Sequence, residues 1–423
     1  MTVRRVVPGE VRGVAVAPPS KSYTHRALVA AHLAEREYEI VRPLLSDDTR
    51  ATVRAIERLG STVRTEGHRW VVRPRSGGAA RAVTIDCAQS GTTLRLVAPL
   101  AARSGRTVRL TGRGRLPQRP ITELFRALGK LGATCRTLRT GRGLPATVRG
   151  PLRGGAVALD ASQSSQFASA LLLTLPTLPE ASRIDLIGPI VSAPYIDATL
   201  RVLDHHRIQY RHRGRRFALP GGQTYRGRRF AVPGDASSAA YLWTAAAVTS
   251  GRVRVTGVPP DWPQADRAVL AVLRAAGARV REDRDGATVE GGTLRPFRAD
   301  LTHCPDLYPL AGVLAATIPG SSRLTGAPHL VFKESDRRSG TVRIARALGG
   351  RVRAERGGLT IRGADRARPL RLLDLDDHRL VMSAAVGALA ADGVSTIGDA
   401  AAVRKSFPEF WSVLDGLRGT VAP

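Results

Sequence analysis

A helix-and-strand pattern recurs six times, about every 70 residues, and it restricts the folds open to this chain. Each copy is an apolar helical stretch that stops near a glycine and runs into a short strand rich in Val and Arg. Glycine commonly ends helices, and alternating apolar and polar residues are typical of half-exposed strands. In the third copy, His206 stands where glycine is expected. The copies are residues 54–64, 126–136, 201–210, 272–281, 344–353 and 413–421.

A unit of this length is too long for a helical-pair repeat and fits a βαβ-type unit with extra strands. The 423 residues also exceed one ordinary hydrophobic core, so we expect two domains. A polar, glycine-rich stretch at 221–229 leads into 234–241, where Asp235 is placed to cap a helix running through Ala247. We therefore expect a domain boundary near Pro233, with three repeats on each side.

The charge balance is strongly basic, with 65 Lys and Arg against 35 Asp and Glu. These basic residues are spread along the whole chain, and aromatic residues make up only 4% of it, which leaves few platforms for base stacking. We therefore expect no nucleic-acid partner. The positive field still favours small anionic substrates.

No apolar run of about 18 residues and no apolar segment after the first residues are present, so neither a membrane partner nor a secretory signal is expected. The three cysteines, Cys87, Cys135 and Cys304, have neither zinc-site nor disulfide spacing. The expected compartment is the reducing cytoplasm.

Only four of the basic residues are lysines: Lys21, Lys130, Lys333 and Lys405. An ammonium group is a compact charge that can give up its proton, whereas guanidinium stays protonated. Chance explains Lys130, which falls on the surface of an expected helix. The other three lie in polar segments, which indicates a functional site.

Polar segments near expected helix starts interrupt the Arg, Ala and Val background. Helix N-termini attract anions through their free N–H groups and their dipole. Each segment alone could equally be a capped, solvated helix start. Together they offer about six cations, several hydroxyls and one or two carboxylates, which fits two anionic substrates and proton transfer. No metal-binding cluster, phosphate-binding loop or dinucleotide motif is recognisable, so no metal or cofactor is expected.

Ten short motifs in order give the chain a resemblance to the 5-enolpyruvylshikimate-3-phosphate synthase family of enolpyruvyl transferases. They are PSKS, SGTTLR, RPI, SSQF, PYID, GDASSAAY, PDL, KESDR, DHR and KSFP, and they span essentially the whole sequence. The resemblance implies an α/β fold of two similar domains, each of three βαβαββ repeats (an inverse α/β barrel), with the active site in the interdomain cleft. One domain would comprise residues 21–233 and mainly bind the acceptor. The other would comprise residues 1–20 and 234–423.

The resemblance also implies a site for each of two substrates. The phosphate of shikimate 3-phosphate would be bound by Ser164, Ser165, Ser192 and Lys333. The rest of that molecule would be held by Ser22, Arg26, Tyr195 and Asp306, with Gln166 between the two substrates. Phosphoenolpyruvate would lie against Lys21, Gly91, Arg119, Gln166, Arg337, Arg379 and Lys405.

The implied reaction is addition followed by elimination, in the shikimate pathway of aromatic amino acid biosynthesis. Asp306, with Lys333, would take the proton of the acceptor's 5-hydroxyl as it attacks C2 of phosphoenolpyruvate. Glu334 or Lys21 would protonate C3, and phosphate would leave the tetrahedral ketal phosphate with help from cations that include Lys405. The resemblance further implies inhibition by glyphosate, competitive with phosphoenolpyruvate and weakened by Gly91→Ala.

The residues that depart from the family pattern include Gln89 before the SGTTLR motif and Ala193 before PYID. They leave open an alternative acceptor, either another phosphorylated alcohol or a nucleotide. The cell-wall enzyme that uses UDP-N-acetylglucosamine is disfavoured because residues 111–119 contain no cysteine. A non-catalytic anion- or RNA-binding protein would explain the charge, but it would not explain lysines accompanied by Asp306 and Glu334. We expect a monomer.

Overall fold

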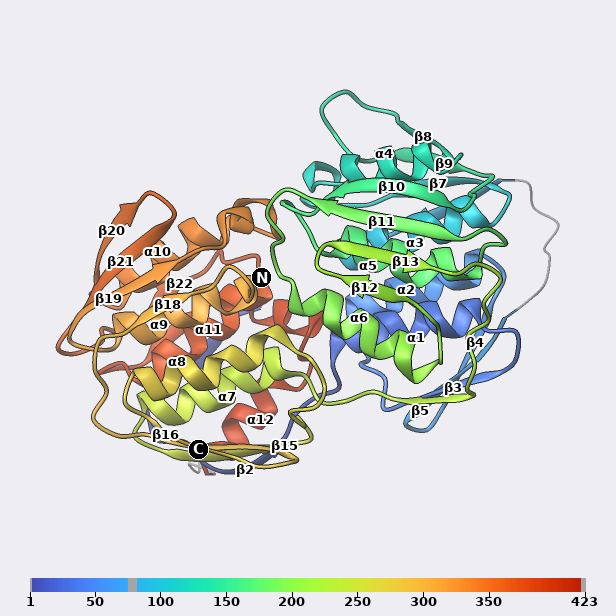
Figure 1. Cartoon of the computed structure of the whole chain (residues 1–423). Helices are drawn as coiled ribbons and strands as arrows, with labels where there is room; N and C mark the ends of the chain where they lie inside the picture. Colours follow the sequence, from blue (N-terminus) through green and yellow to red (C-terminus); the bar gives the residue numbers. More distant parts are fainter. Residues whose placement is uncertain (1, 75–81, 420–423) are drawn as a thin grey trace. The chain divides into compact units, whose positions relative to one another are not determined.

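The computed structural model describes residues 2–74 and 82–419, and the chain forms two compact units (Figure 1). The central unit is Pro19–Val232, and the terminal unit is Met1–Pro18 with Pro233–Pro423. Both are mixed α/β structures built from small sheets, as the sequence predicts. No α-helix among the described residues has both the length and the hydropathy to span a bilayer.

The central unit contains three four-stranded sheets, each flanked by two helices of its own repeat. In each sheet the first two strands are parallel, and an antiparallel hairpin completes it. The second repeat contains β6 (Ala82–Asp86), α3 (Gly91–Arg103), β7 (Thr107–Thr111), α4 (Thr122–Lys130), β8 (Thr134–Thr137) and β9 (Ala146–Arg149). The third contains β10 (Gly155–Asp160), α5 (Gln166–Thr174), β11 (Ser182–Ile187), α6 (Pro194–His205), β12 (Arg211–Arg213) and β13 (Arg216–Leu219).

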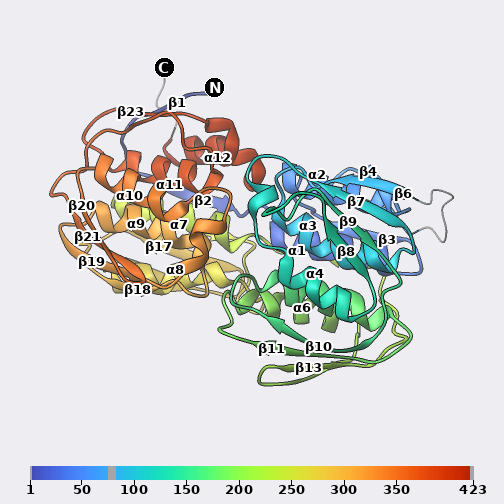
Figure 2. The same ribbon diagram turned by 90° about the horizontal axis from the view of Figure 1, so that it is seen from above.

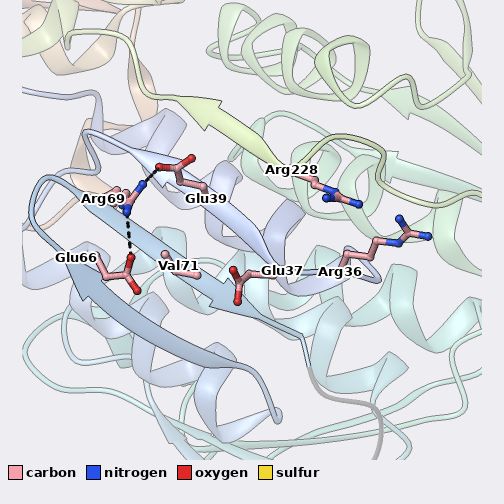
Figure 3. A pocket seen from close by; sticks show the side chains of 7 residues that line it. All are labelled: Arg36, Glu37, Glu39, Glu66, Arg69, Val71 and Arg228. Carbon is pink, nitrogen blue, oxygen red and sulfur yellow. Dashed lines mark hydrogen bonds and ion pairs between the residues drawn. The ribbon is translucent and has the colours of Figure 1, made fainter.

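The first repeat takes its first strand from the far end of the unit. It contains α1 (Lys21–Leu33), β3 (Tyr38–Val41), α2 (Asp47–Arg58), β4 (Thr62–Glu66), β5 (Arg69–Arg73) and β14 (Arg229–Ala231). The strand β14 pairs with β3 in parallel, so the sheet order is β14-β3-β5-β4. On its outward face Arg69 lies 2.9 Å from Glu39 and 3.3 Å from Glu66, so the arginine there is paired (Figure 3).

The terminal unit repeats this plan with two strands supplied by the N-terminus. Its first sheet has the order β16-β17-β15-β2, its second β18-β19-β21-β20 and its third β1-β23-β22. Because β1 and β2 complete sheets here, the chain has to cross between the units twice.

The first repeat of the terminal unit contains β2 (Arg12–Val16), α7 (Ala236–Val248), β15 (Arg252–Thr256), α8 (Val269–Ala275), β16 (Arg279–Glu282) and β17 (Gly286–Glu290). The second contains β18 (Arg298–Asp300), α9 (Tyr308–Ala316), β19 (Gly320–Thr325), α10 (Arg337–Ala347), β20 (Arg351–Glu355) and β21 (Gly358–Gly363). The third contains β1 (Arg4–Val6), β22 (Arg371–Leu372), α11 (His378–Leu389), β23 (Ser395–Ile397) and α12 (Phe410–Leu417).

The first helices of the repeats form the core of each unit (Figure 2). In the terminal unit α11 packs against both α7 and α9, and in the central unit α3 packs against α5 and α1. Every residue of α9 and of α11 is buried, which requires apolar side chains around the whole helix. Polar groups are therefore concentrated at the helix starts. The cap expected of Asp235 is confirmed, because its side chain accepts a hydrogen bond from Ser238 N at 2.8 Å.

The third copy of the repeat differs from the sequence reading by one residue. The left-handed position after the helix is Arg207 (φ 57°), equivalent to Gly60 (φ 112°), and not His206. His206 is instead buried, and its Nε2 lies 2.8 Å from the Tyr38 hydroxyl. The glycine pattern is lost here because an arginine occupies the left-handed position. In the sixth copy, the strand expected up to Val421 lies outside the described residues.

Candidate active site

The candidate residues of the central unit gather at helix starts. Lys21, Gly91 and Gln166 are the first residues of α1, α3 and α5. Ser22 follows Lys21, and Ser164 and Ser165 immediately precede α5. Ser192 lies two residues before α6, with a left-handed backbone (φ 55°). These helix starts present backbone N–H groups and hydroxyls, the chemistry that binds phosphate.

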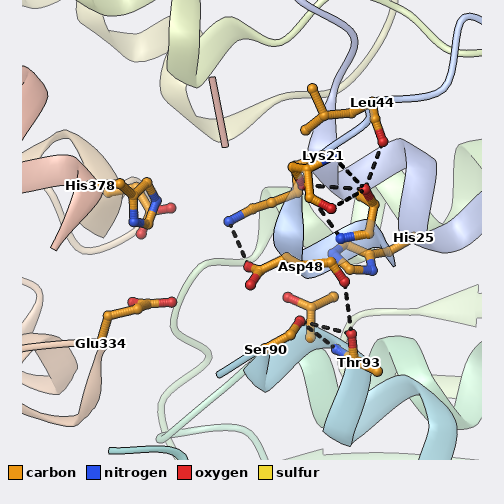
Figure 4. A network of polar contacts seen from close by, with 12 residues as sticks. Lys21, His25, Leu44, Asp48, Ser90, Thr93, Glu334 and His378 are labelled. Carbon is orange, nitrogen blue, oxygen red and sulfur yellow. Dashed lines mark hydrogen bonds and ion pairs between the residues drawn. The ribbon is translucent and has the colours of Figure 1, made fainter. Parts of the chain in front are cut away.

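Lys21 belongs to a polar network that joins three helices (Figure 4). Its Nζ lies 3.2 Å from Asp48 Oδ2, and both side chains are largely buried. Thr93 Oγ1 donates to the Asp48 carbonyl at 3.2 Å and to Ser90 Oγ at 2.8 Å. The start of α3 is thereby tied to the segment that holds Lys21.

His25 extends this network into the core without adding charge. Its Nδ1 lies 2.7 Å from Thr52 Oγ1, which lies 2.7 Å from Thr93 Oγ1. Burial lowers the pKa of His25 to about 3, so the ring is neutral at physiological pH. This histidine therefore positions α1 against α2 and α3.

Arg26 is buried and hydrogen-bonded to two other helix starts. It donates to Thr199 Oγ1 at 2.9 Å, to the Tyr195 carbonyl at 2.7 Å and to Ser169 Oγ at 3.3 Å. Burial lowers its pKa to about 10, and its exposed fraction is 2%. Arg26 thus fixes the α6 start that carries Tyr195, and its guanidinium is largely occupied by protein oxygens.

Arg119 lies directly over Gly91. A Cβ added at Gly91 would come within 2.7 Å of Arg119 Cζ. Only glycine at this position therefore leaves enough space for the Arg119 guanidinium group where it lies. The sequence reading missed Arg95, which donates to Gln166 Oε1 at 2.9 Å and to the Pro120 carbonyl at 2.9 Å. Arg95 therefore positions both Gln166 and the loop that bears Arg119. Its place one helical turn after Gly91 in the SGTTLR motif was the available signal.

The terminal unit collects its candidates around Asp306, in the 3-10 helix η4 (Pro305–Leu307). Its Oδ1 lies 2.8 Å from Arg337 Nη1 and 3.5 Å from Lys333 Nζ, and its Oδ2 lies 3.1 Å from Arg379 Nη2. Burial acts to raise the pKa of Asp306, but the positive charges of Lys333, Arg379 and Arg337 lower it well below its usual value. The structure thus brings together four of the residues named from the sequence.

Arg337 is held by two further carboxylates. Its Nη2 donates to Glu334 Oε2 at 2.8 Å, and its Nε donates to Asp377 Oδ2 at 2.9 Å. The sequence reading missed Asp377, although it stands in the DHR motif. This buried carboxylate also accepts from Ser335 Oγ at 2.9 Å and from Arg379 N at 2.8 Å. Asp377 therefore links the two arginines expected to bind phosphoenolpyruvate.

A second buried carboxyl group near Asp306 was also missed. Asp266 is 1% exposed, and its Oδ2 is hydrogen-bonded to the Ser237 hydroxyl at the start of α7. Burial, with the negative charge of Asp306, raises the pKa of Asp266 to about 7. The QAD segment that carries it gives no sequence signal of a buried acid.

Lys405 is not part of the Asp306 cluster. It is the last residue of the 3-10 helix η6 (Ala400–Lys405), is half-buried, and makes no hydrogen bond or ion pair to Asp306, Glu334, Arg337 or Arg379. Across the part of the chain that the structure describes, no group of three or more His, Cys, Asp or Glu residues is arranged to hold a metal ion.

Comparisons with known proteins agree over almost the whole chain. The family model described as EPSP synthase (3-phosphoshikimate 1-carboxyvinyltransferase) matches residues 7–414. A 3-phosphoshikimate 1-carboxyvinyltransferase of Halobacterium salinarum is 42% identical over 421 residues, covering 97% of this chain and 98% of that protein. Another protein of that name, from Methanocorpusculum labreanum, is 37% identical over 406 residues, covering 95% of each. The solved EPSP synthase of Acinetobacter baumannii has a TM-score of 0.81 at 23% identity, covering 99% of this chain and 98% of that one, so the fold is shared.

Proposed function

The chain belongs to the EPSP synthase (3-phosphoshikimate 1-carboxyvinyltransferase) family, and we propose on this premise that the helix-start residues described above carry its reaction. The activity is transfer of the carboxyvinyl group of phosphoenolpyruvate to the 5-hydroxyl of shikimate 3-phosphate, with release of phosphate. The names of the relatives support this acceptor and not another phosphorylated alcohol or a nucleotide. The observation that best supports the residue assignment is Asp306, a carboxylate held by three cations.

Shikimate 3-phosphate is assigned first. Ser164, Ser165 and Ser192 take its phosphate, supported by the places of their hydroxyls just before α5 and α6, at the positive ends of these helices. Lys333 adds a positive charge to that phosphate. Its ring hydroxyls are assigned to Ser22, Arg26, Tyr195 and Asp306.

Phosphoenolpyruvate is assigned to the arginines and to the α1 and α3 starts. Arg119, Arg337 and Arg379 are the partners for its carboxylate and phosphate, since guanidinium groups bind such anions in a bidentate manner. Gly91 serves by giving Arg119 room. Lys21, Gln166 and Lys405 complete this set.

The proposed base is Asp306, and phosphoenolpyruvate makes it basic. In the free protein its pKa is well below the usual value because three cations face it. When a substrate carboxylate pairs with Arg337 and Arg379, their effect on Asp306 weakens and its proton affinity rises. The base is thus competent only when the electrophile is bound.

The steps then balance without a cofactor. The 5-oxygen attacks C2 of phosphoenolpyruvate as its proton passes to Asp306, and Glu334 or Lys21 delivers a proton to C3. The phosphate leaves the ketal with its bonding electrons, stabilised by the cations, and C3 gives its proton back. The cytoplasm is the proposed compartment, because Cys87, Cys135 and Cys304 are all free thiols.

The test is phosphate release from phosphoenolpyruvate, with and without shikimate 3-phosphate. We expect release only when both substrates are present, and its loss in Lys21→Ala and in Asp306→Asn. Lys130→Ala is the matched control, since Lys130 is exposed at the end of α4 and should leave the rate unchanged. Full activity of Lys21→Ala would refute the assignment of that residue, and no release by the native protein with both substrates would refute the function.

A further inference from the structure

Arginines that are spread along the sequence meet on one sheet face of the central unit. In the sheet β6-β7-β9-β8, one cross-strand row is Thr84, Arg109, Thr147 and Arg136. The adjacent row on the same face is Ala82, Thr107, Arg149 and Thr134. All three arginines are exposed, and neither row contains a carboxylate.

The hairpin loop next to these rows adds two more exposed arginines, Arg139 and Arg142, between β8 and β9. We call Arg109, Arg136, Arg139, Arg142 and Arg149 the arginine face. None of the five forms an ion pair with another described residue. The nearest carboxylate of the sheet, Asp86 at the end of β6, accepts a hydrogen bond from Ala88 N at 2.8 Å.

The repeat fold itself does not require such a face. The corresponding sheet of the first repeat, β14-β3-β5-β4, also presents arginines outward, but glutamates accompany them (Figure 3). Arg69 pairs with Glu39 and Glu66, Arg229 lies 3.6 Å from Glu39, and Arg64 lies 3.7 Å from Glu66. The first repeat therefore pairs its outward arginines with glutamates, whereas the second repeat does not.

The sequence predicts no nucleic-acid partner because its basic residues are scattered, but the sheet gathers some of them on one face. We propose that the arginine face binds the phosphate backbone of duplex nucleic acid, without sequence selectivity and apart from the catalytic reaction. Unpaired guanidinium groups beside threonine hydroxyls are the donors that phosphate oxygens accept. Arg109 and Arg136 lie two strands apart, roughly 10 Å, so they reach different phosphates. The cross-strand rows contain no aromatic residue, which favours a duplex over a single strand that needs base stacking. The net charge of +30 draws the polyanion to the protein.

The experiment is fluorescence anisotropy of a labelled 20-base-pair DNA of random sequence, titrated with the full chain at several NaCl concentrations. Each phosphate contact contributes about 0.9 to the slope of log K against log salt. We expect the triple variant Arg109→Gln, Arg136→Gln, Arg149→Gln to lower that slope by about 2.7. The single variant Arg136→Gln should lower it by about 0.9.

The matched control is Arg64→Gln, Arg69→Gln, Arg229→Gln, which removes the same charge from the paired face and should change the slope by less than about 1. Both triple variants should keep native phosphate release, since these arginines are exposed and lie outside the proposed active site. An equal loss of slope in the two triple variants would overturn the proposal, because bulk charge alone would then explain binding. Binding of inorganic polyphosphate but not of the duplex would overturn it as well.

Discussion

Asp377→Asn tests whether one buried carboxylate sets both arginines of the proposed phosphoenolpyruvate site. Asp377 accepts four hydrogen bonds: from Arg337 Nε (2.9 Å), Arg337 Nη2 (3.3 Å), Ser335 Oγ (2.9 Å) and Arg379 N (2.8 Å). Asparagine keeps one acceptor oxygen and turns an NH₂ group toward the other donors. Two of the four hydrogen bonds are then lost, whichever way the amide is oriented.

The expected cost follows from what Arg337 retains. Breaking a buried ion pair by removing one partner costs about 3–5 kcal/mol. Arg337 still has Asp306 at 2.8 Å and Glu334 at 2.8 Å, so its charge stays compensated. We therefore expect a smaller loss of stability, of roughly 2–3 kcal/mol. If the displaced arginines cost the transition state a similar amount, kcat/KM for phosphoenolpyruvate should fall roughly 30- to 150-fold.

The assay is steady-state phosphate release with each substrate varied in turn. The KM for shikimate 3-phosphate should stay near the native value, because the arginines that Asp377 holds are assigned to the other substrate. Asp374→Asn is the control, since Asp374 is 76% exposed and pairs with Arg343 at the surface. A kcat/KM for phosphoenolpyruvate within threefold of native would refute the reasoning, provided that the variant is folded at the assay temperature.

Three further changes follow from the same structure. Asp266→Asn should make the protein more stable than native at pH 8 by up to about 4 kcal/mol and equal to it near pH 4, as measured by urea unfolding at both values. Burial raises the pKa of Asp266 to about 7, so between about pH 4 and pH 7 the folded state keeps a proton that the unfolded state releases. Native stability therefore falls as pH rises through that window. A difference in stability that does not change with pH would contradict this. Gly91→Ala should raise the KM for phosphoenolpyruvate several-fold and weaken competitive inhibition by glyphosate, because the new Cβ would lie 2.7 Å from Arg119 Cζ. An unchanged KM and unchanged inhibition would count against this placement of Arg119. Asp48→Ala should lower kcat tenfold or more and leave the fold intact, because Lys21 loses the carboxylate 3.2 Å from its Nζ, and a native kcat would show that Lys21 needs no such partner.

The repeats and the helix starts could be predicted because their signals are local. A glycine after a helix and alternation in a strand each depend on a few neighbouring residues. The same local logic failed at His206, since the left-handed position fell on Arg207. No pattern marks a non-glycine residue that adopts positive φ.

The missed residues share a different cause. Arg95, Asp266 and Asp377 act through partners that are distant in sequence, such as Gln166, 71 residues from Arg95, and Arg337, 40 residues from Asp377. Motif reading selects residues that would face a ligand, whereas these three face other side chains. Burial reveals them, and burial depends on tertiary packing.

The net charge of +30 is not reflected in the Asp306 cluster of the terminal unit, which is close to neutral. Its three cations, Lys333, Arg337 and Arg379, face three carboxylates, Asp306, Glu334 and Asp377. An anionic substrate is therefore attracted there by the arrangement of donors and by helix starts, and it has to compete with carboxylates already in place. The surplus arginines lie on exposed sheet faces, where solvent and salt weaken their field at the site. Substituting the exposed arginines should therefore weaken the binding of polyanions to the protein surface more than it changes the rate of the catalysed reaction.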